Sequence, residues 1–485
     1  MQPYQGLNQQ FIDGVWRDGR TDATIQDVNP YDNSVLLDIK CAGVDELDEA
    51  YQAAQRAAVG WAALLPQERR DVLLKAADLL HQRKDEFAHW IAQEAGGAHA
   101  KAEIEVMLAR EVILEASSFP SRLHGFILPS STPGKESRVY RKPLGVIGII
   151  SPWNFPVHLS MRSIAPALGC GNAIVVKPAS QTPVTGGTLL AKLFEEAGLP
   201  KGVFNVVMGQ SSVIGDPFVT HPIPKLISFT GSTPVGKGIG KLAGENLKKV
   251  ALELGGNNVF IVLEDADIDL AVAAGMMGKF MHQGQICMAI NRFLVHERVY
   301  DEFRDKLVAK TKALKVGDPR DKATDIGPLI DTKQVQRIQQ DIDASLTQGA
   351  KLECGGQAKG AILYPTVLSN ARNDMPIAQN EIFGPVAVLI PFKDDQEMLK
   401  LANEVDFGLS GALHTRNVER GVHLARQVET GMIHVNDQSV NDEPNAPFGG
   451  ERESGMGRFG GEWVMDEMTR VQWVTVQHTP RDYPI

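Results

Sequence analysis

The chain contains little cysteine. Only Cys41, Cys170, Cys287 and Cys354 occur among 485 residues, and no two of them form a Cys-x-x-Cys pair. This pattern excludes a zinc site or dithiol redox motif of that type, and it is too sparse for a disulfide scaffold. We therefore expect no metal site and a reducing compartment, the cytoplasm, in which one thiolate can serve as a nucleophile.

Long apolar runs and excess positive charge are also missing. No run approaches the roughly 18 residues that span a bilayer, and the first basic residue is Arg17, too late for the charged start of a signal peptide. With 49 Lys and Arg against 59 Asp and Glu, the net charge is −10. We therefore expect neither a membrane nor a nucleic-acid partner. At about 150 residues per domain, the length allows two large domains or three.

The order of the patterns along the chain predicts an α/β protein. Apolar residues recur at helical spacing from Val44 to Ala58, and Pro66 opens a second helix. Pro, Gly, Ser and Thr then break the pattern between about 120 and 143, which indicates a loop or an irregular arm. From 144 onward, short apolar strands alternate with helices, which predicts a parallel sheet covered on both faces. A second α/β lobe follows from about 254.

Two glycine-rich motifs differ in what they predict. Gly455-Met-Gly-Arg-Phe-Gly460 has the glycine spacing of a dinucleotide fingerprint but follows a polar loop, so an ordinary loop is favoured. Gly231-Ser-Thr-Pro-Val-Gly-Lys-Gly238 follows a strand and opens a helix, but Gly238 replaces the Ser or Thr that a P-loop needs for magnesium. Its N–H groups suit a pyrophosphate without a metal, and a tight turn without a ligand is an equal alternative.

Three residues are candidates for chemistry, and each is ambiguous alone. Cys287 has apolar neighbours, and a cysteine in that setting is most often an inert core thiol. Glu253 lies between two leucines, where a buried carboxylate is either functional or a satisfied structural group. Asn154 follows a strand, in a turn where asparagine is common.

With their flanking segments, these residues resemble the aldehyde dehydrogenase superfamily from about Phe11 to about Val476. Five motifs occur in order: Pro152-Trp-Asn-Phe-Pro156, Phe229-Thr-Gly-Ser232, Leu252-Glu-Leu-Gly-Gly256, Gly284-Gln-Ile-Cys287 and Glu381-Ile-Phe-Gly-Pro385. The resemblance implies an α/β fold with a Rossmann-like cofactor domain, an α/β catalytic domain and a small β oligomerisation arm.

The resemblance also implies domain limits and a homo-oligomer. Residues 1–121 and 143–253 would form the NAD(P)-binding domain, and residues 254–455 the catalytic domain. Residues 122–142 and 456–485 would be oligomerisation segments of a homodimer or homotetramer. Within the second segment, Thr469 to Val476 has the alternation of an added edge strand.

The catalytic roles follow from the same resemblance. Cys287 would attack the aldehyde carbon as a thiolate, and the Asn154 amide with the Cys287 N–H would hold the oxyanion. After hydride transfer leaves a thioester, Glu253 would act as general base on a water molecule.

The resemblance places the cofactor as well, and it favours the phosphate interpretation of the turn at Ser232. Lys177 would hold the adenine ribose, Glu381 would bind the nicotinamide ribose and Phe383 would pack near the nicotinamide. The other expected contacts are Ser151, Trp153, Ser180, Gly231, Gly236 and Leu254. Strict NAD enzymes of the family often carry glutamate where Ser180 stands, so we expect dual use of NAD and NADP.

The segment from His434 to Phe448 looks most like the aromatic-aldehyde branch, which includes benzaldehyde and vanillin dehydrogenases. Phe155, Leu159, Met281 and Met288 would form an apolar substrate pocket. Arg162 occupies a position where enzymes for carboxylated semialdehydes also carry arginine, but Met281 stands where their second cationic group is expected. We expect Arg162 to bind a ring hydroxyl or to form a structural ion pair, because an unpaired buried cation is costly.

Other functions stay open at this point. A succinic-semialdehyde-type dehydrogenase is the first alternative, and a thiol esterase pairing Cys287 with His282 is a weaker one. A binding protein built on a retired dehydrogenase is disfavoured by the intact Cys287, Glu253 and Asn154. An acyl-CoA-forming enzyme is disfavoured because Glu253 suits hydrolysis by water.

Overall fold

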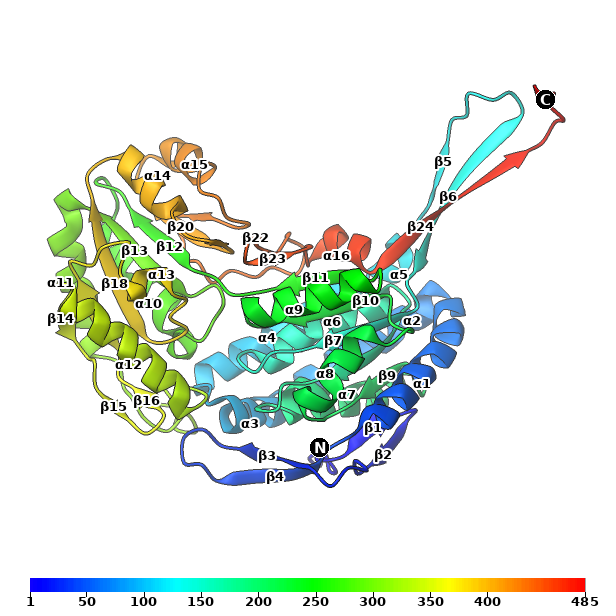
Figure 1. The fold of residues 1–485 in the computed structure, drawn as a ribbon, viewed down its shortest axis with the longest axis horizontal. Helices are drawn as coiled ribbons and strands as arrows, with labels where there is room; N and C mark the ends of the chain where they lie inside the picture. Colours follow the sequence, from blue (N-terminus) through cyan, green and yellow to red (C-terminus); the bar gives the residue numbers. More distant parts are fainter. Residues whose placement is uncertain (485) are drawn as a thin grey trace.

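The computed structural model describes residues 1–484, which form two α/β lobes and a projecting arm (Figure 1). The first lobe contains an eight-stranded sheet in the order β2-β1-β9-β8-β7-β10-β11-β23. Its strands are β1 (Gln10–Ile12), β2 (Val15–Arg17), β7 (Val146–Ile150), β8 (Ala173–Lys177), β9 (Phe204–Val206), β10 (Leu226–Thr230), β11 (Lys249–Glu253) and β23 (Gly455–Met456). The five strands from β9 to β11 are parallel, as expected.

Helices surround this sheet. They are α1 (Val44–Ala63), α2 (Pro66–Gln82), α3 (Lys84–Ala95), α4 (His99–Ala116), α5 (Phe119–Arg122), α6 (Pro156–Gly169), the π-helical turn η1 (Val184–Thr188), α7 (Leu189–Ala197), α8 (Ser211–Thr220), α9 (Thr233–Glu245) and α16 (Gly461–Glu467). The predicted helix from Val44 is confirmed, and Pro66 is the first residue of α2.

The second lobe has its own sheet, in the order β14-β17-β18-β13-β12-β20-β21. All neighbours in it are parallel except β14 and β17. Its strands are β12 (Asn258–Val262), β13 (Ile290–His296), β14 (Lys351–Cys354), β17 (Thr366–Ser369), β18 (Val386–Phe392), β20 (Gly411–His414) and β21 (His434–Val435). Its helices are α10 (Ile268–Phe280), η2 (Met281–Gly284), η3 (Glu297–Val299), α11 (Tyr300–Lys312), α12 (Thr332–Thr347), α13 (Pro376–Gln379), α14 (Asp395–Asn403) and α15 (Val418–Ala425).

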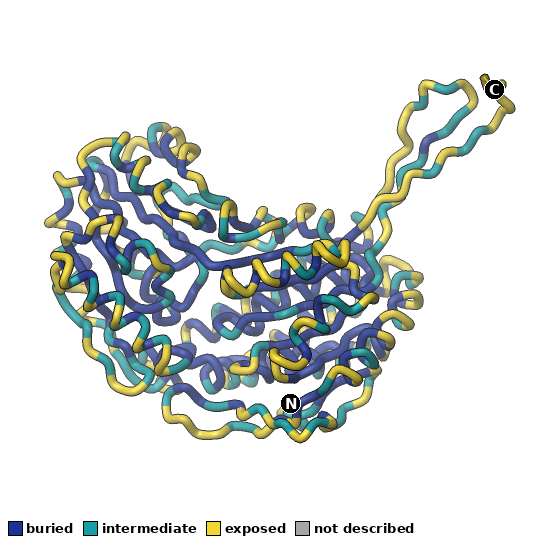
Figure 2. Tube along the Cα trace, in the orientation of Figure 1, coloured by how far each residue is buried: buried dark blue, intermediate teal, exposed yellow. Residues whose placement is uncertain are grey.

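Strand β12 shows why both faces of the second sheet are covered. Val259 and Ile261 belong to one buried cluster, whereas Phe260 and Val262 belong to another. Because successive side chains of a strand point to opposite faces, a wholly apolar strand contributes side chains to two separate hydrophobic cores, one on each face of the sheet. Figure 2 shows the central strands of both lobes as buried, in agreement with β7, β8, β12 and β13.

Residues 120–143, for which the pattern indicated a loop or an irregular arm and the resemblance implied a β arm, contain two strands of an exposed arm. Strands β5 (Phe126–Leu128) and β6 (Lys135–Pro143) pair with β24 (Thr469–Gln477) in an antiparallel sheet. Figures 1 and 2 show this sheet leaving the main body with largely exposed residues. Smaller pairs are β3 (Thr24–Val28) with β4 (Val35–Lys40), β15 (Ala358–Lys359) with β16 (Ile362–Leu363), and β19 (Phe407–Gly408) with β22 (Glu451–Arg452).

The chain passes from the first sheet to the second through residues 254–257 and returns when β23 joins β11. The domain limits themselves stay a prediction. The Gly455 motif lies in this returning segment and not after a parallel strand.

Among residues 1–484, none of the helices has the combination of length and apolar character needed to pass through a bilayer.

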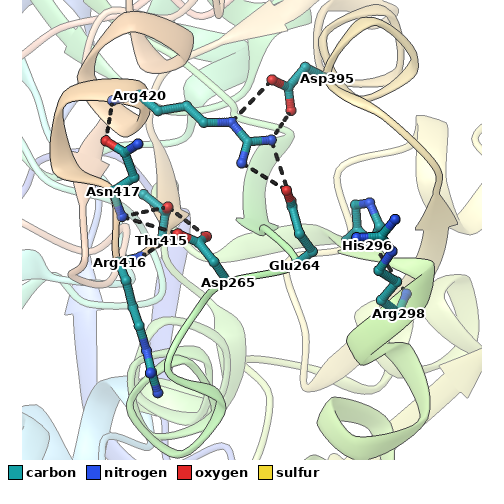
Figure 3. Close-up of polar contacts among 9 residues, drawn as sticks. All are labelled: Glu264, Asp265, His296, Arg298, Asp395, Thr415, Arg416, Asn417 and Arg420. Atoms are coloured by element: carbon teal, nitrogen blue, oxygen red, sulfur yellow. Dashed lines mark hydrogen bonds and ion pairs between the residues drawn. The ribbon is translucent and has the colours of Figure 1, made fainter.

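The carboxyl edge of the second sheet is closed by side chains of the chain itself (Figure 3). After β12, the Asp265 carboxylate accepts hydrogen bonds from the Thr415 hydroxyl at 2.7 Å and from the N–H groups of Arg416 and Asn417 at 3.2 and 3.1 Å. Arg420 pairs with Glu264 and Asp395. An anion-binding turn at the start of α15 is thereby occupied by Asp265.

Candidate active site

The carboxyl edge of the first sheet meets the amino edge of the second at a cavity of about 330 Å³. Turns after β7, β10 and β11 line it from one side, and the segment before β13 lines it from the other. Its wall contains Pro152, Trp153, Asn154, Leu159, Thr230, Gly231, Ser232, Glu253, Leu254, Gly255, Cys287, Gln334, Arg337, Glu381 and Phe383. The cavity therefore brings the three predicted catalytic residues together with six of the predicted cofactor contacts.

Cys287 is carried by a strained loop. His282, Gln283 and Gly284 follow one another with φ of 49°, 56° and 71°. A non-glycine residue in this region typically costs about 1–3 kcal/mol, so contacts must hold the loop in place. The Gln283 amide donates to the carbonyls of Gly96 at 3.0 Å and Pro328 at 2.8 Å.

Glycine at position 284 permits a close approach at this loop. A Cβ added to Gly284 would lie 2.3 Å from the carbonyl oxygen of Gly384. On the far side of Cys287, Asn258 donates to the Cys287 carbonyl at 2.7 Å. Cys287 is thus fixed from both sides through backbone contacts.

Asn154 is oriented by the same loop. Its Nδ2 donates to the Gln285 carbonyl at 2.9 Å, and the side chain is buried. A carbonyl can only accept, so this contact fixes the NH₂ end of the amide toward the loop and leaves a second N–H to donate. The backbone N–H of Cys287 has no acceptor within residues 1–484. Two donors therefore remain for an oxygen beside the Cys287 sulfur.

Burial dominates the electrostatics of Cys287 and Glu253. It raises the pKa of the Cys287 thiol to about 12, against the opposing charge of Arg162. It raises the pKa of Glu253 to about 8, against Arg162 and Arg458. Neither carboxylate oxygen of Glu253 has a hydrogen-bond partner in the described chain. Glu253 is therefore a carboxyl group poised to exchange a proton near neutral pH.

Glu381 forms the opposite wall. Its Oε1 accepts the Gly256 N–H at 2.9 Å, and burial raises its pKa to about 7 against Gly256, Arg337 and Lys279. Next to it, Phe383 meets the Trp153 ring edge to face, with centroids 5.4 Å apart.

The start of α9 separates the cavity from a second cleft of about 490 Å³, which Lys177, Ser211 and Ile239 help to line. The first turn of α9, Thr233-Pro-Val-Gly236, is uncharged. A Cβ on Gly236 would lie 2.3 Å from Leu254, so this turn packs directly on the loop after β11. The arrangement fits a dinucleotide whose pyrophosphate lies on the helix N-terminus and whose two ends enter the two spaces.

The other predicted cofactor residues have different surroundings. Lys177 donates to the Ser211 hydroxyl at 2.9 Å, and burial lowers its pKa. Ser180 is exposed and contacts Gln181, whereas Ser151 is buried, with Gly186 as its acceptor at 3.5 Å.

Of the predicted substrate residues, Leu159 lies on the cavity wall. Phe155 and Met288 are buried in the core of the first lobe, and Met281 packs against it. The Phe155 ring meets His282 edge to face at 5.5 Å. Burial, then the charge of Lys101, holds the pKa of His282 well below its usual value.

Arg162 has a carboxylate partner. Its Nη1 donates to Asp442 at 3.0 Å, and its guanidinium lies 3.9 Å from the Phe448 ring centre. Asp442 also contacts His158 at 2.7 Å. Burial opposes ionisation, but Arg162 and His158 hold the pKa of Asp442 below its ordinary value. The contacts are those of a buried ion pair.

Sequence reasoning missed several residues around the cavity. Gln334 and Arg337 line it from α12, and Arg337 donates to the carbonyls of Glu381 and Ile382 at 3.1 and 2.5 Å. Lys279 is buried, and its Nζ has no partner in the part of the chain that is described. These residues carry no local motif, so only the fold brings them to the site.

Comparison with known proteins agrees with the family that the five sequence motifs and the residues of the cavity indicate. Residues 16–474 match the aldehyde dehydrogenase family. The chain is 49% identical to the benzaldehyde dehydrogenase YfmT of Bacillus subtilis, with 99% of each covered. It is 48% identical to a vanillin dehydrogenase of Corynebacterium glutamicum, with 97% of each covered.

A solved structure supports the same grouping. The NAD-dependent benzaldehyde dehydrogenase of Corynebacterium glutamicum superposes with a TM-score of 0.90 at 45% identity, covering 98% of this chain and 97% of that one. The five sequence motifs, the two-lobed fold and these matches agree: the chain belongs to the aldehyde dehydrogenase family.

Proposed function

We propose that this enzyme oxidises an aromatic aldehyde of the benzaldehyde or vanillin type to its carboxylic acid. The observation that carries the proposal is the meeting of Cys287, Glu253 and Asn154 in one cavity beside the start of α9. The names of the most similar relatives support an aromatic substrate.

In the first step, the thiol proton of Cys287 passes to solvent water, and the resulting thiolate sulfur attacks the aldehyde carbon. The C–S bond forms, and the π electrons of the carbonyl move to oxygen. The free N–H of the Asn154 amide and the Cys287 N–H stabilise that oxyanion.

NAD or NADP held at the start of α9, with Glu381 and Phe383 beside it, would supply the hydride acceptor. Loss of that hydride from the Cys287 adduct restores the carbonyl and leaves a thioester. Glu253 then takes a proton from water as the water oxygen attacks the thioester carbon. The C–S bond breaks, the acid is released and the Cys287 thiolate returns.

Replacement of the two central residues separates these steps. Cys287→Ala should abolish turnover, because the thioester can no longer form. Glu253→Gln should release one equivalent of reduced cofactor per site and then stall as an acyl-enzyme. Stopped-flow absorbance measures both, and normal steady-state turnover by Glu253→Gln would show that another group is the base.

The pKa of Glu253 predicts the pH dependence of thioester hydrolysis. Only the carboxylate accepts a proton, so with a pKa of about 8 the hydrolysis rate should rise about tenfold from pH 6 to pH 7 and level off above pH 8. Single-turnover decay of the acyl-enzyme isolates this step. A rate that is flat across that range would contradict the assignment.

The cations near the site favour a neutral aldehyde over a carboxylated one, because each already has partners. Arg162 is paired with Asp442, and Arg337 on the cavity wall donates to the carbonyls of Glu381 and Ile382. We expect kcat/KM for benzaldehyde to exceed that for succinic semialdehyde by at least roughly tenfold, about 1.4 kcal/mol in transition-state binding. Parallel kinetics with the two aldehydes test this, and the reverse order would favour the semialdehyde alternative.

We propose that NADP is used alongside NAD. Ser180 places no negative charge near Lys177, so a 2′-phosphate meets no repulsion from that position. Ser180→Glu should lower kcat/KM for NADP at least about tenfold and spare NAD, because like charges at short range repel. Ser180→Ala is the uncharged control. A wild-type kcat/KM for NADP thousands of times below that for NAD would refute dual use.

We also propose a homodimer or homotetramer joined through the arm, in the cytoplasm. Ile127, Val471 and Trp473 are 75%, 68% and 69% exposed, and such apolar surface is typical of an interface. A reducing compartment suits a mechanism that needs Cys287 as a free thiolate. Sedimentation velocity of the full chain distinguishes these assemblies from a monomer.

A further inference from the structure

A buried ion pair lies behind Asn154, outside the cavity wall. Lys101 and Glu105 are one helical turn apart on α4, and they are 3% and 0% exposed. Their side chains contact each other directly. Burial lowers the pKa of Lys101, although the charge of Glu105 opposes this shift.

The pair holds the turn that carries Asn154. Lys101 Nζ donates to the backbone carbonyl of Asn154 at 2.8 Å. Glu105 Oε1 accepts the N–H groups of Val157 at 2.8 Å and His158 at 3.3 Å. One member therefore fixes a carbonyl before α6 and the other caps the first turn of that helix.

The surroundings of Lys101 make the contact geometrically demanding. Its Nζ lies 4.2 Å from the centre of the Phe155 ring, and the His282 ring packs against the same phenyl group. The buried ammonium thus contacts a carboxylate, a carbonyl and an aromatic face, with little freedom to move.

Stability alone is a weak reason for such a pair. Taking two charges out of water is costly, and apolar replacements for buried ion pairs are often neutral or stabilising. Here the charges hold both sides of the turn whose side chain meets the Gln285 carbonyl of the nucleophile loop. A small displacement of that turn would move the Asn154 amide away from the reacting oxygen, and oxyanion stabilisation depends steeply on donor geometry.

We propose that Lys101 is a positioning residue that acts on catalysis through Asn154, with Glu105 as its partner. This inference rests on the oxyanion role proposed for Asn154. Lys101 itself is not among the residues that line the cavity.

A double-mutant cycle tests the inference, with Lys101→Met, Asn154→Ala and the double variant assayed for kcat/KM with benzaldehyde. Lys101→Met alone should lower kcat/KM about tenfold or more. Added to Asn154→Ala, it should lower kcat/KM less than about twofold, because the group it positions is gone. If kcat/KM of the double variant falls by the product of the two single-variant losses, the inference is overturned.

Two controls separate positioning from general damage. Arg69, a buried cation on α2, donates to the carbonyls of Ala62 and Leu64 at 3.0 and 3.1 Å. Arg69→Met should reduce thermal stability. If it also lowers kcat/KM, the loss in the double variant with Asn154→Ala should equal the product of the two single losses. Alkylation of Cys287 by iodoacetamide develops no carbonyl oxyanion, so Lys101→Met should change its rate less than about threefold. A parallel tenfold fall in alkylation would overturn the inference.

The experiment also distinguishes this inference from the proposed function. If Asn154→Ala retains full activity, the oxyanion role fails and the inference fails with it. If Asn154→Ala is impaired but Lys101→Met is not, only the positioning role fails. Should Lys101→Met not fold, Lys101→Arg, which keeps the charge but changes the donor geometry, enters the same cycle under the same criteria.

Discussion

The hydrogen bond from the Asn154 amide to the Gln285 carbonyl joins the two halves of the site. Asn154 belongs to a turn of the first sheet, whereas Gln285 lies two residues before Cys287, at the edge of the second. Because a carbonyl can only accept, the contact fixes which end of the amide faces the loop and leaves the second N–H of that end free to donate. The strained loop at 282–284 and its Gln283 anchors are needed to present that carbonyl.

Burial keeps the titratable groups of the site in their neutral forms. The pKa values of Cys287, Glu253 and Lys279 shift to about 12, 8 and 7, because desolvation disfavours the charged form of each group. A neutral thiol and a protonated carboxyl group cost less free energy to bury than their charged forms. Each becomes charged only when it loses its proton. The permanent charges nearby, Arg162 and Asp442, neutralise each other. The region therefore holds few uncompensated charges before substrate arrives.

The sequence predicted those features that are local. Apolar runs at 146–150 and 226–230 became parallel strands, and the motif residues Asn154, Glu253 and Cys287 line one cavity. It did not predict that Lys101 reaches Asn154 across 53 positions or that Asp442 reaches Arg162 across 280. Such pairings depend on how helices pack, which a periodic pattern does not encode. The local pattern at 120–143 did not distinguish a loop from an arm, because the strands of this segment gain their order from pairing with residues 469–477.

The two sheets show how similar architectures acquire different roles. Both have parallel strands and a carboxyl edge at which helices begin, and such edges are where α/β sheets bind ligands. In the first sheet, the start of α9 is uncharged, and residues at this start line two cavities. In the second, Asp265 already satisfies the N–H groups before α15, and Arg420 is paired twice. The second sheet therefore presents Cys287 to the cavity at its amino edge, while its carboxyl edge is sealed by the chain's own carboxylate.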